Sequence, residues 1–333
     1  MIITQTPFRM SFFGGGSDYP DFYKEYGGSV MSTTFDKYCF VTVRHLPRFF
    51  EYSNQITYSV IERTNSVDEI DHPAVREAMK FLDMHELRIV YEADLPARSG
   101  LGSSSSFAVG LLNAFHALKG EYCHKKQLAQ EAIYLERTLC KEHGGIQDQI
   151  AAAYGGFNRI NFSSEGFEVT PVIIPIDKKR KLNDNLMLFF TGFSRFSSNI
   201  SEEQERSMKS KISQLKEMAS LVDTAEEILE NKKDNLDEFG QLLHYTWELK
   251  RGLTSRVSNN TIDEIYQKGL AAGALGGKLL GAGGGGFLLF YVNKEHQNAV
   301  REALKNLLYV PFQFESYGSR VLYYSPEIYE FKK

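Results

Sequence analysis

A segment rich in glycine and serine, residues 99–106, carries the groups that bind phosphate. It reads SGLGSSSS and lies just after Pro96. Glycines let the backbone approach an anion closely, and the N-terminus of a following helix offers unpaired N–H groups at a positive dipole end. Serine hydroxyls add hydrogen bonds, and one of them can bind Mg²⁺ beside the phosphates. The alternative is a flexible linker or a helix cap with surplus serines.

Two acidic residues lie in helical patterns downstream of this loop. Glu136 stands among Ala132 and Leu139 at helical spacing, so it borders the apolar face of its helix. A carboxylate there costs free energy unless it is paired or bound to a metal; the alternative is an edge residue that reaches water. Asp148 follows the Gly-Gly pair at 144–145, near a helix start that favours its ionised form. Its alternative role is a helix cap.

A third group of polar residues lies near the N-terminus. Arg9, the three glycines at 14–16 and Asp18 fall within ten residues of one another. We expect a tight turn there, because glycines allow a close approach to a small polar ligand. The alternative is a hairpin turn with a surface aspartate.

Alternating apolar patterns and helical periodicity predict the elements that must position these residues. Residues 87–92 form a strand that runs into the serine-rich loop, and residues 107–118 form the helix that follows it. Further strands are expected at 38–45, 186–191, 287–292, 311–314 and 321–324, and further helices at 125–140, 146–154, 201–231, 236–251, 261–272 and 295–308. The fold class is therefore α+β, without internal repeats.

Length, charge and cysteine content bound the class of protein. A chain of 333 residues exceeds one usual core, so we expect two domains, 1–178 and 179–333, divided at the polar segment 177–185. The net charge of -4 argues against nucleic acid and anionic membranes as partners. Three dispersed cysteines and no basic leader or long apolar run predict a cytoplasmic protein without disulfides.

Three motifs, taken in order, resemble the galactokinase, homoserine kinase, mevalonate kinase and phosphomevalonate kinase (GHMP kinase) superfamily. The first motif is matched at residues 7–19, the second at 96–104 and the third, LGAGGGGF, at 280–287. The resemblance covers essentially the whole chain. It implies an N-terminal domain like domain 2 of ribosomal protein S5 and a ferredoxin-like C-terminal domain.

The resemblance also implies a role for each motif residue in an ATP- and Mg²⁺-dependent kinase. Asp148 would accept or orient the proton of the attacking hydroxyl, and Arg9 would stabilise the transferring phosphoryl group. Ser104 and Glu136 would bind Mg²⁺. The ATP phosphates would be held by Pro96, Ser99, Gly100, Leu101, Gly102, Ser103, Ser104 and Ser105, and the substrate by Gly15, Gly16, Ser17, Asp18, Asp148, Arg195, Gly283 and Gly284.

Other chemistries fit less well. Gly281, Gly283 and Gly286 satisfy the dinucleotide G-x-G-x-x-G pattern, but they precede a strand, whereas that pattern must open a helix. The chain has no G-x-x-x-x-G-K-[ST] loop, no HExxH and no G-x-S-x-G elbow.

The residues of the first motif give information on which substrate accepts the phosphoryl group. Galactokinases carry Glu-His where this chain has Gly15 and Gly16, which argues against galactose. The run SFFGGGSDYP and the segment TGFSR at 191–195 are similar to the D-glycero-D-manno-heptose 7-phosphate kinase branch. That branch phosphorylates the anomeric hydroxyl to the 1,7-bisphosphate for nucleotide-heptose and surface-glycan synthesis. Fucokinases share a related Gly-Gly-x-Ser-Asp motif and are the nearest alternative.

A sugar phosphate needs a cationic pocket besides the ATP site. Arg98 and Arg195 are candidates, although an arginine at such a position is more often a surface residue. A homodimer is a further expectation. The alternative from another class is a catalytically inactive relative that binds a ligand as a regulator, and the intact set of Arg9, Ser104, Glu136 and Asp148 favours the enzyme.

Overall fold

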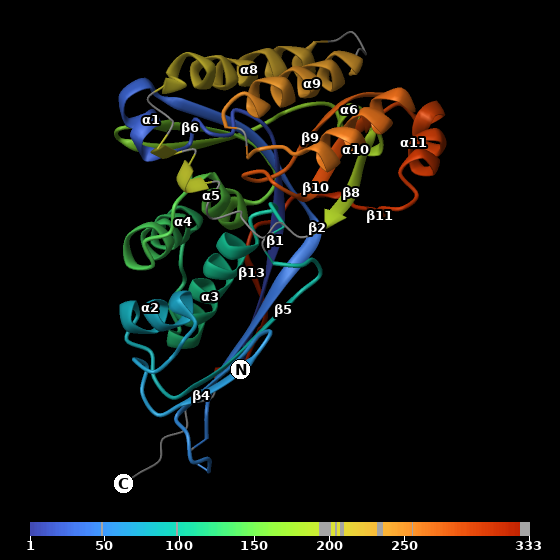
Figure 1. Cartoon of the computed structure of the whole chain (residues 1–333). Coiled ribbons are helices and arrows are strands. Elements are labelled where there is room, and N and C mark those ends of the chain that lie inside the picture. Colours follow the sequence, from blue (N-terminus) through green and yellow to red (C-terminus); the bar gives the residue numbers. More distant parts are fainter. Residues whose placement is uncertain are drawn as a thin grey trace.

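The computed structural model describes residues 1–47, 49–97, 99–192, 201–203, 205–206, 210–231, 236–254 and 256–326. The candidate arginines Arg98 and Arg195 lie outside the described residues. Two antiparallel-rich sheets with helices packed on them make up the described chain (Figure 1).

The first sheet has nine strands built on two long neighbours, β1 and β2. Its main order is β13-β1-β2-β5-β3-β4, with β12 and β6 pairing β2, and β7 pairing β6. All its pairs are antiparallel except β3 with β5. The strands are β1 Ile2–Phe13, β2 Gly28–His45, β3 Asn54–Thr57, β4 Ile61–Thr64, β5 Leu87–Ala93, β6 Phe157–Ser163, β7 Gly166–Pro171, β12 Phe314–Glu315 and β13 Arg320–Tyr324.

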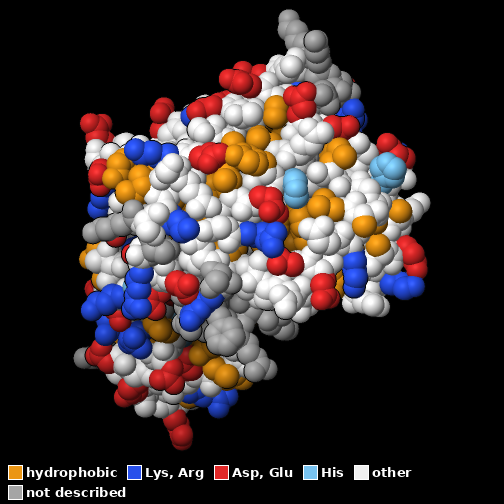
Figure 2. Space-filling model, turned by 45° about the horizontal axis from the view of Figure 1, so that its top comes forward, with side chains coloured by type: hydrophobic (Ala, Val, Ile, Leu, Met, Phe, Trp, Pro, Cys, Tyr) orange, Lys and Arg blue, Asp and Glu red, His pale blue; other side chains and the backbone are white. Residues whose placement is uncertain are grey.

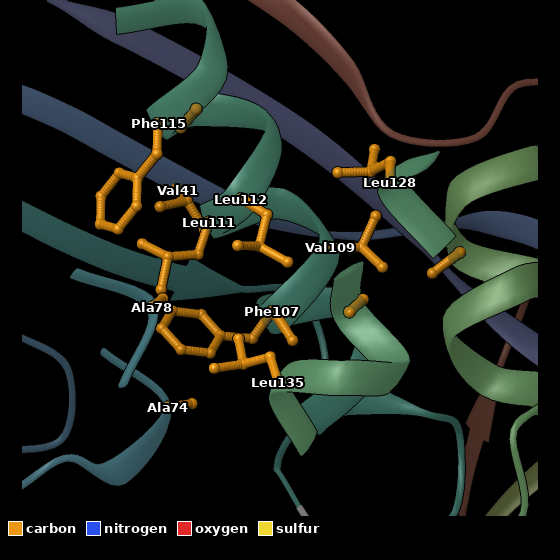
Figure 3. Packing of buried hydrophobic residues seen from close by; sticks show 14 of the residues in the cluster. Val41, Ala74, Ala78, Phe107, Val109, Leu111, Leu112, Phe115, Leu128 and Leu135 are labelled. Atoms are coloured by element: carbon orange, nitrogen blue, oxygen red, sulfur yellow. The ribbon is translucent and has the colours of Figure 1, made fainter. Parts of the chain in front are cut away.

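Four helices and a π-helical turn cover one face of this sheet. They are α2 Pro73–Phe81, α3 Ser103–Lys119, α4 Lys125–Ile133, the turn Tyr134–Leu139 and α5 Gln147–Tyr154, and α1 Pro20–Tyr26 lies beside β6. Figure 3 shows α3 at the centre, where Phe107, Leu111 and Phe115 pack with Val41 of β2 and Ala78 of α2. This packing anchors the helix whose N-terminus follows the serine-rich loop.

The second sheet has four antiparallel strands in the order β11-β8-β10-β9. Its strands are β8 Leu186–Gly192, β9 Ala274–Leu279, β10 Gly286–Val292 and β11 Leu308–Val310. Its helices are α6 Ile176–Asp184, α8 Ile212–Glu230, α9 Asp237–Arg251, α10 Asn260–Ala271 and α11 Gln297–Ala303, with a 3₁₀ turn at Lys294–His296. An apolar cluster joins β1, β2, β8 and β10 with α8 and α9, so both sheets share one core region.

The structure corrects some expectations from the sequence and adds detail to others. The first glycine motif is not only a turn, because residues 7–13 continue strand β1 and only 15–18 turn. The helix expected at 125–140 changes into a π-helix at Tyr134–Leu139. The polar segment 177–185 folds as α6, with Leu182 buried. The last long helix stops at Ala303, since Leu308 already pairs with β8.

Charged side chains of both signs are interspersed over the described part of the face in Figure 2. In the described chain, no helix has the length and apolar character to cross a membrane.

A buried histidine marks the end of α3, away from the glycine motifs. The Nε2 atom of His116 lies 2.6 Å from Glu131 Oε2, and its Nδ1 atom lies 3.2 Å from Glu121 Oε2. A hydrogen bond with Cys123, followed by the one with Glu131, raises the pKa of His116 to about 10. This histidine therefore ties α3 to α4 as a cation.

Candidate active site

The three sequence motifs meet at one cleft of about 580 Å³. The end of β1 and its turn, the loop before α3, the π-helical turn, α5, α9 and the loop after β9 all contribute to its wall. The predicted site residues that line the cleft are Arg9, Gly15, Gly16, Asp18, Gly100, Gly102, Ser103, Ser104, Ser105, Glu136 and Asp148.

An ion pair between Arg9 and Asp148 lies within the cleft. Arg9 Nη2 donates to Asp148 Oδ2 at 2.6 Å, and Arg9 Nε donates to Oδ1 at 2.8 Å. The arginine side chain is 6% exposed and that of the aspartate 23%, so the carboxylate is the more open partner. Arg9 Nη1 also donates to Gly100 O at 2.7 Å. This bidentate geometry fixes the carboxylate in orientation beside the glycine loop.

Glu136 points from the π-helical turn toward the serines of α3. Its Oε1 accepts from Ser104 Oγ and its Oε2 from Ser105 Oγ, each at 2.6 Å, and Gln149 Nε2 also donates to Oε2. The residue is 1% exposed, and no described cation forms an ion pair with it. A buried carboxylate with only neutral donors, next to a serine hydroxyl, fits a hard divalent cation such as Mg²⁺.

The serine-rich loop presents an uncapped helix N-terminus to the cleft. Gly102 is the N-cap of α3, has a left-handed φ of 75° and makes no side-chain cap hydrogen bond. The C-terminal glycine loop packs directly on this segment, since a Cβ on Gly281 would overlap the backbone of Gly100. Side chains at these glycines would keep the two loops apart. The start of α3 points backbone N–H groups and the positive end of the helix dipole toward the cleft, which fits an anion.

Asp18 is a buried carboxylate that lines the cleft near Asp148. It accepts from Gly16 N at 3.0 Å and from Gln147 N at 3.2 Å, and it is 1% exposed. Burial, followed by the charge of Asp148, raises the pKa of Asp18, although the two N–H donors oppose this. A Cβ on Gly145 would overlap the carboxylate, which accounts for glycine at that position. The alternative of a surface aspartate is therefore excluded.

Other predicted site residues do not line the cleft. Ser17 is buried and its hydroxyl closes the first turn by donating to Gly14 O at 2.8 Å. Leu101 belongs to the apolar core, and Ser99 Oγ donates to Pro96 O at 2.7 Å. These residues hold the loops in shape without lining the cleft themselves. Gly284 lines a separate hollow beside the start of α10, and the position of Gly283 is set by close packing against Val257.

The sequence prediction missed several polar residues that line the cleft, among them Ser11, Gln147, Lys250 and Lys278; the others are Tyr19, Arg137, Lys141, Glu142, His143 and Ser201. The Ser11 Oγ and Gln147 Oε1 atoms are buried and have no hydrogen-bond partner in the structure. Ser11 had a signal, because it lies within the first motif. The two lysines had none, since they come from α9 and β9 and reach the cleft only in the folded chain.

Family models confirm what the motifs indicate. The model described as GHMP kinases N terminal domain matches residues 71–156, and the model described as GHMP kinases C terminal matches residues 224–310. The chain belongs to the GHMP kinases. It is accordingly a phosphotransferase with an alcohol acceptor, and kinases of this family use ATP as the phosphate donor.

This GHMP kinase is similar to several known proteins, three of which are compared with it by identity and coverage. It is 28% identical over 325 residues to the D-glycero-alpha-D-manno-heptose 7-phosphate kinase of Campylobacter jejuni, covering 91% of this chain and 93% of the relative. It is 26% identical to the bifunctional fucokinase/GDP-fucose pyrophosphorylase of Arabidopsis thaliana, over 90% of this chain but 31% of that protein. A solved D-glycero-D-manno-heptose 1-phosphate kinase from Bacteriodes thetaiotaomicron shares the fold, with a TM-score of 0.77, 24% identity and coverage of 99% and 100%.

Proposed function

We propose that this GHMP kinase transfers the γ-phosphoryl group of ATP to the anomeric hydroxyl of D-glycero-D-manno-heptose 7-phosphate. The product would be the 1,7-bisphosphate, used for nucleotide-heptose and surface-glycan synthesis. The observation that carries this choice is the similarity to a heptose 7-phosphate kinase over nine tenths of both chains. Gly15 and Gly16 in the turn that lines the cleft support it, because galactokinases carry Glu-His there.

Asp148 and Arg9 are the proposed catalytic residues. Phosphoryl transfer needs positioning and charge stabilisation more than covalent chemistry from the protein. The open carboxylate of Asp148 would accept or orient the proton of the anomeric hydroxyl. Arg9, held on Asp148 and on Gly100 O, would stabilise the charge of the phosphoryl group and of the ionised nucleophile.

Ser104 and Glu136 are the proposed ligands of Mg²⁺. When bound, the ion would neutralise charge on the phosphate oxygens during transfer. The buried Glu136 carboxylate supports this role, because its described donors are all neutral. The N–H groups at the start of α3 and the hydroxyls of Ser103 and Ser105 would hold the phosphates.

The test is a coupled ADP-release assay with Mg-ATP over heptose 7-phosphate, fucose, galactose and mevalonate. We expect turnover with heptose 7-phosphate at a kcat/KM at least a hundredfold above the other acceptors. Turnover of fucose without turnover of heptose 7-phosphate would overturn the proposed acceptor.

Fucose is the second candidate acceptor. An L-fucokinase/L-fucose-1-P guanylyltransferase of Bacteroides fragilis is 32% identical over 65% of this chain, although the match spans only 23% of that protein. A non-catalytic regulator is less well supported, because Arg9, Ser104, Glu136 and Asp148 all line one cleft. The division into domains 1–178 and 179–333, the cytoplasmic location and the homodimer stay predictions.

A further inference from the structure

Two buried lysines of the C-terminal half line the catalytic cleft. Lys250, at the end of α9, is 8% exposed, and Lys278, in β9, is 3% exposed. Lys250 Nζ donates to Leu279 O at 2.9 Å and to Gly281 O, and Lys278 Nζ donates to Phe12 O at 2.7 Å. An ammonium group has three N–H donors, so one remains on Lys250 and two remain on Lys278.

The charge of these lysines is unbalanced within the described chain. No described carboxylate forms an ion pair with Lys250 or Lys278, and Asp148 is already engaged by Arg9. Burial, followed by the charge of Arg9, lowers the pKa of Lys250 to about 7. Burial, and then the charges of Lys250 and Arg9, lowers the pKa of Lys278. Buried cations without a counter-ion are costly, so an anionic ligand at this wall would relieve the cost.

The position of Lys278 places the two lysines near Ser11 and the glycine turn at residues 15–18, where we expect the acceptor to bind. Its partner Phe12 O follows Ser11, whose buried Oγ lines the cleft and has no hydrogen-bond partner. Ser11 Oγ and Gln147 Nε2 each lie 3.8 Å from the point where a Cβ on Gly15 would stand, so both flank the acceptor turn. The proposed function assigns the ATP phosphates to the start of α3 and the Mg²⁺ to Ser104 and Glu136, and so leaves these lysines without an assigned ligand.

We propose that Lys250, Lys278 and Ser11 form an anion subsite that binds the phosphate which the acceptor already carries. The subsite makes this kinase select phosphorylated sugars over the corresponding free sugars. It rests on the proposed function in one respect, because it assumes that the acceptor enters between the turn at residues 15–18 and Asp148. Arg98 and Arg195, which the sequence offered for this task, lie outside the described residues.

The test compares Lys250→Met, Lys278→Met and Ser11→Ala with the wild-type protein. Calorimetric titration measures binding of heptose 7-phosphate to the complex with a non-hydrolysable ATP analogue, and binding of the analogue alone. We expect each lysine variant to lose about 10- to 100-fold in sugar-phosphate affinity, because hydrogen bonds to charged groups are worth this much. Analogue affinity should stay within about threefold, and Lys305→Met, an exposed lysine paired with Glu302, should match the wild type.

A thermal melt of the unliganded variants separates binding from folding. Removing an uncompensated buried cation should leave the melting temperature unchanged or raise it. Equal loss of analogue and sugar-phosphate affinity would assign the lysines to the nucleotide and overturn the proposal. Equal affinity of the wild type for heptose and heptose 7-phosphate would overturn it as well.

The same measurements distinguish a wrong heptose substrate from a wrong anion subsite. If wild-type turnover occurs with another phosphorylated sugar, such as mannose 6-phosphate, the acceptor in the proposed function is wrong. Selective loss of affinity for that sugar phosphate in the lysine variants would still support the subsite. If the wild type turns over only free sugars, the subsite is refuted, whereas the sugar-kinase activity stands.

Discussion

Replacing Glu136 by glutamine tests whether this buried carboxylate serves a metal or the fold. Glutamine keeps the size of the side chain and removes its charge. The Ser104 and Ser105 hydroxyls can rotate to meet an amide, and the buried Gln149 Oε1, which has no partner, can accept the new N–H after that side chain flips. The variant should therefore fold with the same contacts.

The expected free energy of unfolding without ligand is close to that of the wild type. Three charge-assisted hydrogen bonds become neutral ones, a loss of about 1 kcal/mol each. Removing a desolvated charge offsets this with a gain of several kcal/mol. We expect a net change within about 1.5 kcal/mol, measured by urea unfolding, with the exposed Glu168→Gln on β7 as the matched control.

The additional stability that the protein gains from bound Mg-ADP should change far more. Saturating Mg-ADP at about 100 times its Kd stabilises a binding-competent protein by about 2.7 kcal/mol, so its melting temperature rises. In Glu136→Gln the increment that depends on Mg²⁺ should vanish, and kcat should fall by about 10²- to 10³-fold. Glu136→Gln protein that retains the full Mg²⁺ increment and normal turnover would refute the metal role. A large loss of unliganded stability would show instead that Glu136 serves the fold.

The remaining predictions concern other parts of the molecule. Asp148→Asn should lower kcat by about 10³-fold while nucleotide Kd stays within about threefold, and near-normal turnover would contradict its role. Gly15→Glu should raise the acceptor KM more than tenfold with ATP KM unchanged, because its side chain fills space beside Ser11; an unchanged acceptor KM would rule this out. The raised pKa of His116 means that its stabilisation is complete below pH 6.5 and is lost as pH rises toward 10. Urea unfolding at pH 6, 8 and 9.5 should show this decline, and His116→Gln should remove it.

The local part of the site could be predicted from the sequence. The serine-rich loop and the helix after it are encoded within about twenty residues, and their glycines and apolar spacing identify them. Glu136 was found for the same reason, since its neighbours show a helical apolar face. The π-helical turn that aims it was not found, because the insertion of one residue in a helical turn leaves no clear periodic signal.

The tertiary part of the site could not be predicted. Lys250 and Lys278 look like ordinary lysines at the end of a helix and in a strand. Only the packing of α9 on β9 and β1, with the hydrogen bond from Lys278 to Phe12 O, brings them to the cleft. The pairing of Arg9 with Asp148 likewise joins residues 139 positions apart. Long-range contacts of this kind depend on the packing of both sheets rather than on local pattern.

The central claim is that this cleft transfers a phosphoryl group from ATP to an anomeric hydroxyl. The most direct measurement is ³¹P NMR of a reaction containing the protein, Mg-ATP and heptose 7-phosphate. We predict loss of the ATP γ-phosphate signal and a new sugar phosphate signal coupled to the anomeric proton, with the 7-phosphate retained. A product phosphorylated at any other position would contradict the account. So would a protein that leaves ATP unconsumed with heptose 7-phosphate but consumes it in a parallel assay whose acceptor is a non-anomeric alcohol.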